Sequence, residues 1–169
     1  MAEHMKAWQV ASPGSVEDKL TLVDYVPQPS RLLQAGELLV QVFSAGINPA
    51  DYKLPWLGIA ARAIMTFPKT LGMDLSGRVV SVGEGITDLS VGDNVLARLD
   101  PTKAPGSLSE YVIVPRDSYA LLSKEFDLDL AAGAPTAALT AYQSIQPYVK
   151  AGDKIFINGG SGGTGTFSI

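Results

Sequence analysis

The 169-residue sequence contains no cysteine and only one histidine, His4. Without cysteine, it can form neither a disulfide nor a cysteine-ligated zinc site. It also has no run of the about 20 apolar residues that a membrane-spanning helix needs. Positive charge is scarce, because 13 Lys and Arg stand against 17 Asp and Glu for a net charge of −4. That balance argues against binding to nucleic acid or anionic membranes. With no secretory signal pattern, a cytoplasmic protein is expected.

The sequence does have the composition of a globular protein, with 46% hydrophobic and 18% charged residues. Short apolar segments separated by Gly, Pro and Asp turns predict a domain that is mainly β, as a barrel or a sandwich. The clearest is Glu37–Ala45, where Leu38, Val40 and Val42 alternate onto one face. Further strands are expected at Lys6–Val10, Leu20–Tyr25, Gly77–Gly83, Val95–Ala97 and Glu110–Val114.

The pattern changes to helical in the alanine-rich stretch from Asp127 to Tyr148. Apolar residues recur there at helical spacing, which indicates a helix with an apolar stripe packed on a core. Pro135 suits the first turn of that helix, and Pro147 suits its end. The residues of the stripe are Ala138, Leu139, Tyr142 and Ile145.

A glycine-rich segment follows, Lys154–Thr166 with the sequence KIFINGGSGGTGT. Ile155–Ile157 is predicted as a strand, and Gly160-x-Gly162-x-x-Gly165 fits the dinucleotide-binding fingerprint. In that fingerprint the glycines allow a tight turn, close approach to a pyrophosphate and close packing of the next helix. An ordinary glycine turn explains the motif alone equally well. The candidate cofactor-binding residues are Gly160, Ser161, Gly162, Gly163, Thr164 and Gly165.

Six segments in order resemble the medium-chain dehydrogenase/reductase superfamily, most of all its zinc-independent quinone oxidoreductase and enoyl reductase branch. They are Gly46–Tyr52, Gly72–Gly77, Val82–Gly83 with Val91–Val95, Gly106–Tyr111, Leu139–Tyr142 and Gly159–Gly165. The resemblance implies a GroES-like β-barrel catalytic domain over residues 1–125. Residues 126–169 would be connecting helices and the first strand and turn of a truncated Rossmann domain. The coenzyme would lie between the two.

The resemblance also implies an oxidoreductase that transfers hydride from NAD(P)H to a conjugated carbonyl or a quinone. NADPH is the expected coenzyme because this branch uses it, with NADH left open, and a homo-oligomer is expected. Zinc alcohol dehydrogenases of the superfamily have a cysteine at the position of Asn48 and a histidine at that of Met73. An amide and a thioether are poor zinc ligands, so no metal is expected. A conjugated acceptor suits this absence, because charge spreads to its oxygen, where hydrogen-bond donors can stabilise it.

By the same resemblance, Asn48 to Tyr52 lie beside the nicotinamide ribose and the substrate. Asn48 and Tyr52 are the candidate catalytic residues, and both, with Asp51, are candidates for binding the coenzyme. The alternatives are structural: a turn residue before Pro49 for Asn48, and the first turn of a helix for Asp51 and Tyr52.

Three residues of the predicted helix complete the candidate site. The resemblance places the Thr140 hydroxyl near the nicotinamide, and Thr136 and Leu139 at the edge of the substrate. The structural alternative for Thr140 is a threonine whose hydroxyl bonds back to a carbonyl of its own helix.

Two other functions remain open from the sequence. One is a co-chaperonin-like binding module, since the barrel type is shared, although such a module needs neither the helix nor the glycine turn. The other is an inactive fragment that acts through protein contacts. Binding of NADPH by the full-length protein would distinguish a reductase from these two alternatives.

Overall fold

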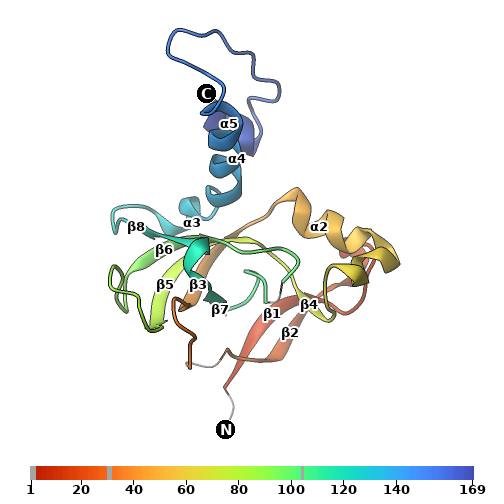
Figure 1. Ribbon diagram of the computed structural model, residues 1–169. Coiled ribbons are helices and arrows are strands. Elements are labelled where there is room, and N and C mark those ends of the chain that lie inside the picture. The colour runs from red at the N-terminus through yellow and green to blue at the C-terminus, as the bar shows by residue number, and fades with distance from the viewer. Residues whose placement is uncertain (1–2, 30–31, 104) are drawn as a thin grey trace.

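The computed structural model describes residues 3–29, 32–103 and 105–169. Its described strands form two antiparallel sheets, with the orders β2-β1-β4 and β7-β3-β5-β6-β8 (Figure 1). The strands are β1 His4–Val10, β2 Leu20–Pro27, β3 Leu38–Gly46, β4 Lys69–Thr70, β5 Asp74–Val82, β6 Asn94–Arg98, β7 Tyr111–Val114 and β8 Tyr119–Leu122. The expected GroES-like, mainly β architecture is confirmed.

The core lies inside the curled five-stranded sheet, where strand alternation points apolar side chains inward. Leu38 and Val40 of β3 and Leu75 of β5 are completely buried in it, together with Val95, Val112 and Val114 from neighbouring strands. Gly77 of β5 lies against β3 so closely that a Cβ there would stand 2.2 Å from the Gln41 carbonyl oxygen. The backbones of β3 and β5 are therefore in close contact three residues after Asp74, the first residue of β5.

The six predicted strands are confirmed, each with small shifts at its ends. The sequence analysis missed β4 and β8. β4 has only two residues, and it pairs with β1 through Val10–Lys69 and Gln9–Thr70. β8 pairs with β6 at the sheet edge. Two of its four residues are exposed, so its sequence lacks the alternation of buried and exposed residues that predicts a strand.

Helices connect and extend the barrel: α1 Val16–Lys19, α2 Pro49–Trp56, α3 Leu128–Ala131, α4 Pro135–Ile145 and α5 Gly163–Ser168, with 3-10 turns η1 Gly58–Ala63 and η2 Arg116–Ser118. The predicted helix start at Pro135 is confirmed. None of the described helices has the length and apolar character needed to cross a bilayer. In Figure 1, α4 rises from one end of the barrel and α5 lies against it.

The predicted strand at Ile155–Ile157 is wrong, because these residues form no regular secondary structure. The side chain of Phe156 is 91% exposed. A strand needs a neighbour to pair its N–H and C=O groups, and no described segment pairs with this one. The helix expected after the glycine turn does form, as α5.

Candidate functional site

The site is organised around Asp74, the first residue of β5, which is 1% exposed. Its Oδ2 accepts from Nδ2 of Asn48 at 2.9 Å and from the backbone N–H of Thr136 at 2.8 Å. Its Oδ1 accepts from the Thr136 hydroxyl at 2.7 Å. One buried carboxylate thus joins β5, the start of α2 and the start of α4.

Asn48 is the N-cap residue of α2 and lies in extended conformation at φ −122° and ψ 157°. Its backbone N–H donates to Oδ2 of Asp51 at 2.7 Å, so a carboxylate in the first turn of the helix closes back onto the cap. Pro49 stands at the first helical position, where its missing N–H costs nothing. The structure therefore gives Asn48 the predicted turn role and, at the same time, holds its side chain on Asp74.

The pKa of Asp51 is raised to about 6, with burial as the largest cause; the hydrogen bond from the Asn48 N–H lowers it, the nearby charge of Asp74 raises it, and Lys69 lowers it. Asp51 is 6% exposed, and its Oδ1 has no hydrogen-bond partner. The buried ammonium of Lys69, 1% exposed, is the counter-charge; its own pKa is lowered to about 8 by burial. Two acids and one base thus share a low-dielectric region behind Asn48.

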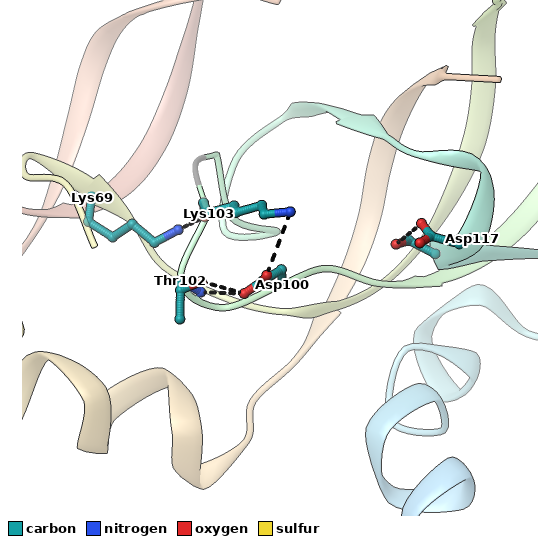
Figure 2. A network of polar contacts seen from close by, with 6 residues as sticks. Lys69, Asp100, Thr102, Lys103 and Asp117 are labelled. Carbon is teal, nitrogen blue, oxygen red and sulfur yellow. Dashed lines mark hydrogen bonds and ion pairs between the residues drawn. The ribbon is translucent and has the colours of Figure 1, made fainter. Parts of the chain in front are cut away.

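Lys69 extends from β4 toward the loop that follows β6 (Figure 2), where its Nζ donates to the Lys103 carbonyl oxygen. Asp100 shapes this loop, because its Oδ1 accepts from the Thr102 N–H at 2.9 Å and from the Thr102 hydroxyl at 2.6 Å. These hydrogen bonds lower the pKa of Asp100. In Figure 2, Asp117 of η2 lies apart from this network.

The three candidate residues of α4 are divided between two faces of the helix. Thr136 faces Asp74, and Thr140 follows one turn later, with its hydroxyl donating to the Thr136 carbonyl oxygen at 2.6 Å. That bond is the structural alternative foreseen for Thr140, and it leaves the oxygen lone pairs of Thr140 as acceptors. Leu139 is 44% exposed and lines a cavity on another side of the helix.

This cavity opens between α4 and the barrel and has a volume of about 1280 Å³. Its walls are largely apolar, with Leu96, Leu99 and Ile113 from the barrel side and Ala138 and Tyr142 from α4. Its charged lining residues are of both signs: Arg98 and Lys103, and Glu37, Asp100 and Asp117. Asn48, Tyr52 and Thr136 are not among the residues that line it. Of the residues assigned to the substrate from sequence, the structure therefore brings Leu139 to the cavity and Thr136 to the Asp74 cluster.

Tyr52 lies on α2 and is 41% exposed. Its ring therefore has accessible surface, whereas the neighbouring Asp51 is buried. The structure places the two consecutive residues in different environments: Asp51 toward the buried charges and Tyr52 toward the surface.

The glycine turn packs against itself and against α4. A Cβ at Gly165 would stand 2.1 Å from the Gly159 carbonyl oxygen, so only glycine fits that position. A Cβ at Gly163 would lie 3.5 Å from Cβ of Ala137, which shows how closely α5 approaches α4. A Cβ at Gly162 would have only the Gly159 carbonyl oxygen near it, at 3.4 Å, so the outer side of the turn is open. The tight turn that the dinucleotide fingerprint requires is therefore present, whereas the packing of the helix on a preceding strand is not, because Ile155–Ile157 forms no strand.

The side chains at the position of the superfamily's catalytic zinc do not fit a zinc ion. Met73 is 2% exposed and packed in the core, and the Asn48 amide donates to Asp74. The Asp74 carboxylate already accepts three hydrogen bonds. Within the described ranges, no cluster of three or more His, Cys, Asp or Glu has a geometry suited to a metal ion.

Residues 34–124 match the alcohol dehydrogenase GroES-like domain family. The chain belongs to the medium-chain dehydrogenase/reductase superfamily. It is 41% identical to a trans-enoyl reductase of Aspergillus terreus, over 98% of this chain and 49% of the relative. It is 34% identical to an NADPH-dependent alkenal/one oxidoreductase of Arabidopsis thaliana, named chloroplastic, over 99% of this chain and 44% of the relative.

Among solved structures, a quinone oxidoreductase from Coxiella burnetii superposes with a TM-score of 0.83 at 31% identity, over 99% of this chain and 52% of that one. The chain spans about half the length of the relatives and structures that it matches.

The sequence analysis missed two residues of the site. Asp74 was noted only as part of a motif, although an acid at the start of an otherwise apolar strand is a signal of a paired buried charge. Lys69 offered no such signal, because a single lysine between Pro68 and Thr70 is usually solvated. Its burial depends on contacts that are distant in sequence, because β4 pairs with β1 and the loop containing Lys103 covers the Lys69 side chain.

Proposed function

We propose that this chain is the N-terminal part of a reductase that transfers hydride from NADPH to a conjugated carbonyl or a quinone without a catalytic metal. The relatives support the coarse activity, because they are named enoyl, alkenal/one and quinone oxidoreductases. NADPH is favoured over NADH by the name of the alkenal/one relative.

The observation that carries the proposal is the state of the Asn48, Met73 and Asp74 side chains. An amide that donates, a buried thioether and a carboxylate that already accepts three hydrogen bonds make a poor set of zinc ligands. Without a Lewis acid, polarisation of a simple carbonyl is difficult. A conjugated acceptor avoids this difficulty, because the negative charge develops on an oxygen remote from the attacked carbon.

When bound, the coenzyme supplies the hydride, and the residues of this chain hold and orient the reactants. The Gly160–Gly165 turn is closed on its inner side and open on its outer side, which suits a pyrophosphate. The Thr140 hydroxyl oxygen and the Asn48 amide are the groups assigned to the nicotinamide end. The Tyr52 hydroxyl is assigned to the acceptor oxygen, where a donor stabilises developing negative charge. Leu139 and the apolar cavity beside it are assigned to the body of the substrate.

The test is NADPH oxidation by the whole protein with a trans-2-enal, a 2-enoyl thioester and a quinone, each compared with NADH. Turnover of at least one conjugated acceptor is expected, unaffected by metal chelators, with no oxidation of ethanol or propanol. Tyr52→Phe and Asn48→Ala are expected to lower kcat/KM. Stoichiometric zinc together with alcohol oxidation would contradict the proposal, and absence of NADPH binding would favour the non-catalytic binding module.

A homo-oligomer and a cytoplasmic location complete the proposal. Sedimentation of the whole protein tests the first. Cell fractionation tests the second, which matters because one relative is named chloroplastic.

A further inference from the structure

Asp74 links parts of the chain that are far apart in sequence, since its partners lie 26 positions before it and 62 positions after it. We propose that Asp74 is a positioning residue: its carboxylate determines which atom of the Asn48 amide is presented to a ligand, and it holds that amide in register with α4. The proposal rests on the proposed function for the identity of the ligand, a nicotinamide coenzyme. Its structural part stands on this chain alone.

The start of α4 explains why the helix needs Asp74. Its N-cap residue is Ala134, which has no side-chain acceptor, and Pro135 has no N–H to donate. The first N–H that needs a partner is therefore that of Thr136, and Asp74 accepts it from another element at 2.8 Å. A negative charge at this end of a helix is also favoured by the helix dipole. Asp74 thus caps α4 and fixes where the helix begins relative to β5.

The same carboxylate orients the Asn48 amide. An ionised carboxylate only accepts hydrogen bonds, and of the two polar atoms of the Asn side chain only Nδ2 donates. With Nδ2 bound to Asp74 at 2.9 Å, Oδ1 is turned away from the carboxylate. The backbone N–H of Asn48 is held by Asp51 at 2.7 Å, so the main chain that carries the amide is fixed as well.

Oδ1, which is also the acceptor that the capping box turns toward the Asp51 N–H, is therefore the Asn48 atom left to offer its second lone pair to a ligand. The matching ligand groups are donors: a ribose hydroxyl or the N–H groups of a carboxamide, both of which occur at the nicotinamide end of the coenzyme. A ligand group that only accepts, such as a carboxylate or a phosphate oxygen, does not fit this orientation. Asp74 acts on the ligand through Asn48 and does not touch it.

The test begins with Asp74→Asn, which keeps the shape of the side chain but offers fewer acceptor lone pairs and can itself donate. Hydrogen exchange of the Asn48 side-chain NH₂ and of the Thr136 backbone N–H is followed by NMR in the 169-residue chain. Both are expected to exchange about tenfold faster or more in the variant, since each loses a bond to a charged acceptor. Asp93→Asn is the matched control, because the Asp93 carboxylate accepts a backbone N–H from Ser90 at 2.9 Å in an exposed turn.

Two threonine variants separate the bonds and guard against loss of folding. Thr136→Val removes only the hydroxyl donor, and Thr136→Ser keeps every donor. Faster exchange of the Asn48 NH₂ in Thr136→Val, restored to the wild-type rate in Thr136→Ser, supports the cluster as one unit. If Asp74→Asn does not fold, the two Thr136 variants decide whether Asp74 holds the Asn48 amide and the start of α4 together.

The kinetic arm uses the whole protein. If Asp74 acts through Asn48, then Asp74→Asn lowers kcat/KM for NADPH by about the same factor as Asn48→Ala, and the double variant shows no further loss. A purely structural role predicts losses that multiply. The proposal is overturned if the Asn48 and Thr136 groups exchange in Asp74→Asn as they do in the control, or if the two kinetic losses multiply. If no variant and no wild-type sample binds NADPH, the proposed function fails, while the exchange rates still decide whether Asp74 positions Asn48.

Discussion

Replacing Asp51 by Asn is expected to make the stability of the chain less dependent on pH. The folded-state pKa of Asp51 is raised from 3.8 to about 6, chiefly by burial. A raised pKa means that the folded state prefers the protonated carboxyl. The contribution of Asp51 to stability is therefore fully present below the unfolded pKa of 3.8, and it is lost as the pH rises through about 6.

The magnitude follows from the shift of about 2 pKa units. Each unit corresponds to ~1.4 kcal/mol, so the buried charge costs about 3 kcal/mol at neutral pH relative to a pH well below 3.8, and about 2.4 kcal/mol of this falls between pH 4 and pH 7. Asn cannot ionise and avoids that cost, while its Oδ1 still accepts the N–H of Asn48. Its NH₂ would occupy the place of the unpartnered Oδ1, at a cost of ~1–3 kcal/mol that does not vary with pH. The pH trend is therefore a cleaner test than the stability at one pH.

The assay is urea unfolding of the 169-residue chain, followed by tryptophan fluorescence, at intervals between about pH 4 and about pH 7. The stability of Asp51→Asn minus that of the wild type should rise by about 2.4 kcal/mol over this range. Asp93→Asn reports the effect of the same substitution in a surface turn. A difference that stays flat from pH 4 to pH 7 would refute the burial argument, because it would mean that Asp51 ionises as freely in the fold as in the unfolded chain.

Two further substitutions test the neighbouring interactions. Lys69→Met removes a buried ammonium whose pKa is lowered from 10.5 to about 8. The stability of the variant relative to the wild type should be highest below pH 8 and should fall as the pH rises toward 10.5, because the wild type then loses its buried charge. Unfolding at about pH 7 and about pH 10 measures this difference in stability, and a difference that is the same at both pH values would contradict the prediction. Gly165→Ala would place a Cβ 2.1 Å from the Gly159 carbonyl oxygen, so the turn must shift. The affinity for NADPH should then fall about tenfold or more. If a fluorescence titration gives the variant and the wild type the same affinity, the turn does not hold the coenzyme.

The strands could be predicted from sequence where their own alternation carries the signal. Glu37–Ala45 is the best example, since Leu38 and Val40 are fully buried while Gln41 and Phe43 are exposed. The helix start at Pro135 was also local, because proline fits the first turn. β4 could not be predicted, since its two residues gain their structure from pairing with β1.

The centre of the site depends on contacts that are distant in sequence. Resemblance pointed to Asn48 and Thr136 separately, and the structure adds that one carboxylate holds both. No local pattern predicts a bond between residues 62 positions apart. The burial of Lys69 has the same origin, because a lysine on a two-residue strand becomes a core residue only when the loop containing Lys103 covers it.

The segment around Phe156 leads to the last prediction. A strand of a parallel sheet is buried on both faces, yet here Phe156 is 91% exposed and Ile155 is 47% exposed. Phe156→Ser in the 169-residue chain removes no buried contact, so it should change the free energy of unfolding by less than about 0.5 kcal/mol. In any form in which this segment pairs as a covered strand, the same truncation should cost about 3–5 kcal/mol, as core phenylalanines do. Urea unfolding measures the loss of stability in the 169-residue chain and in a form in which the segment is a covered strand. Sedimentation shows the oligomeric state of each form. A loss of several kcal/mol in the 169-residue chain would mean that a second copy or another part of the chain already covers Phe156, and a matching change in sedimentation would identify the second copy.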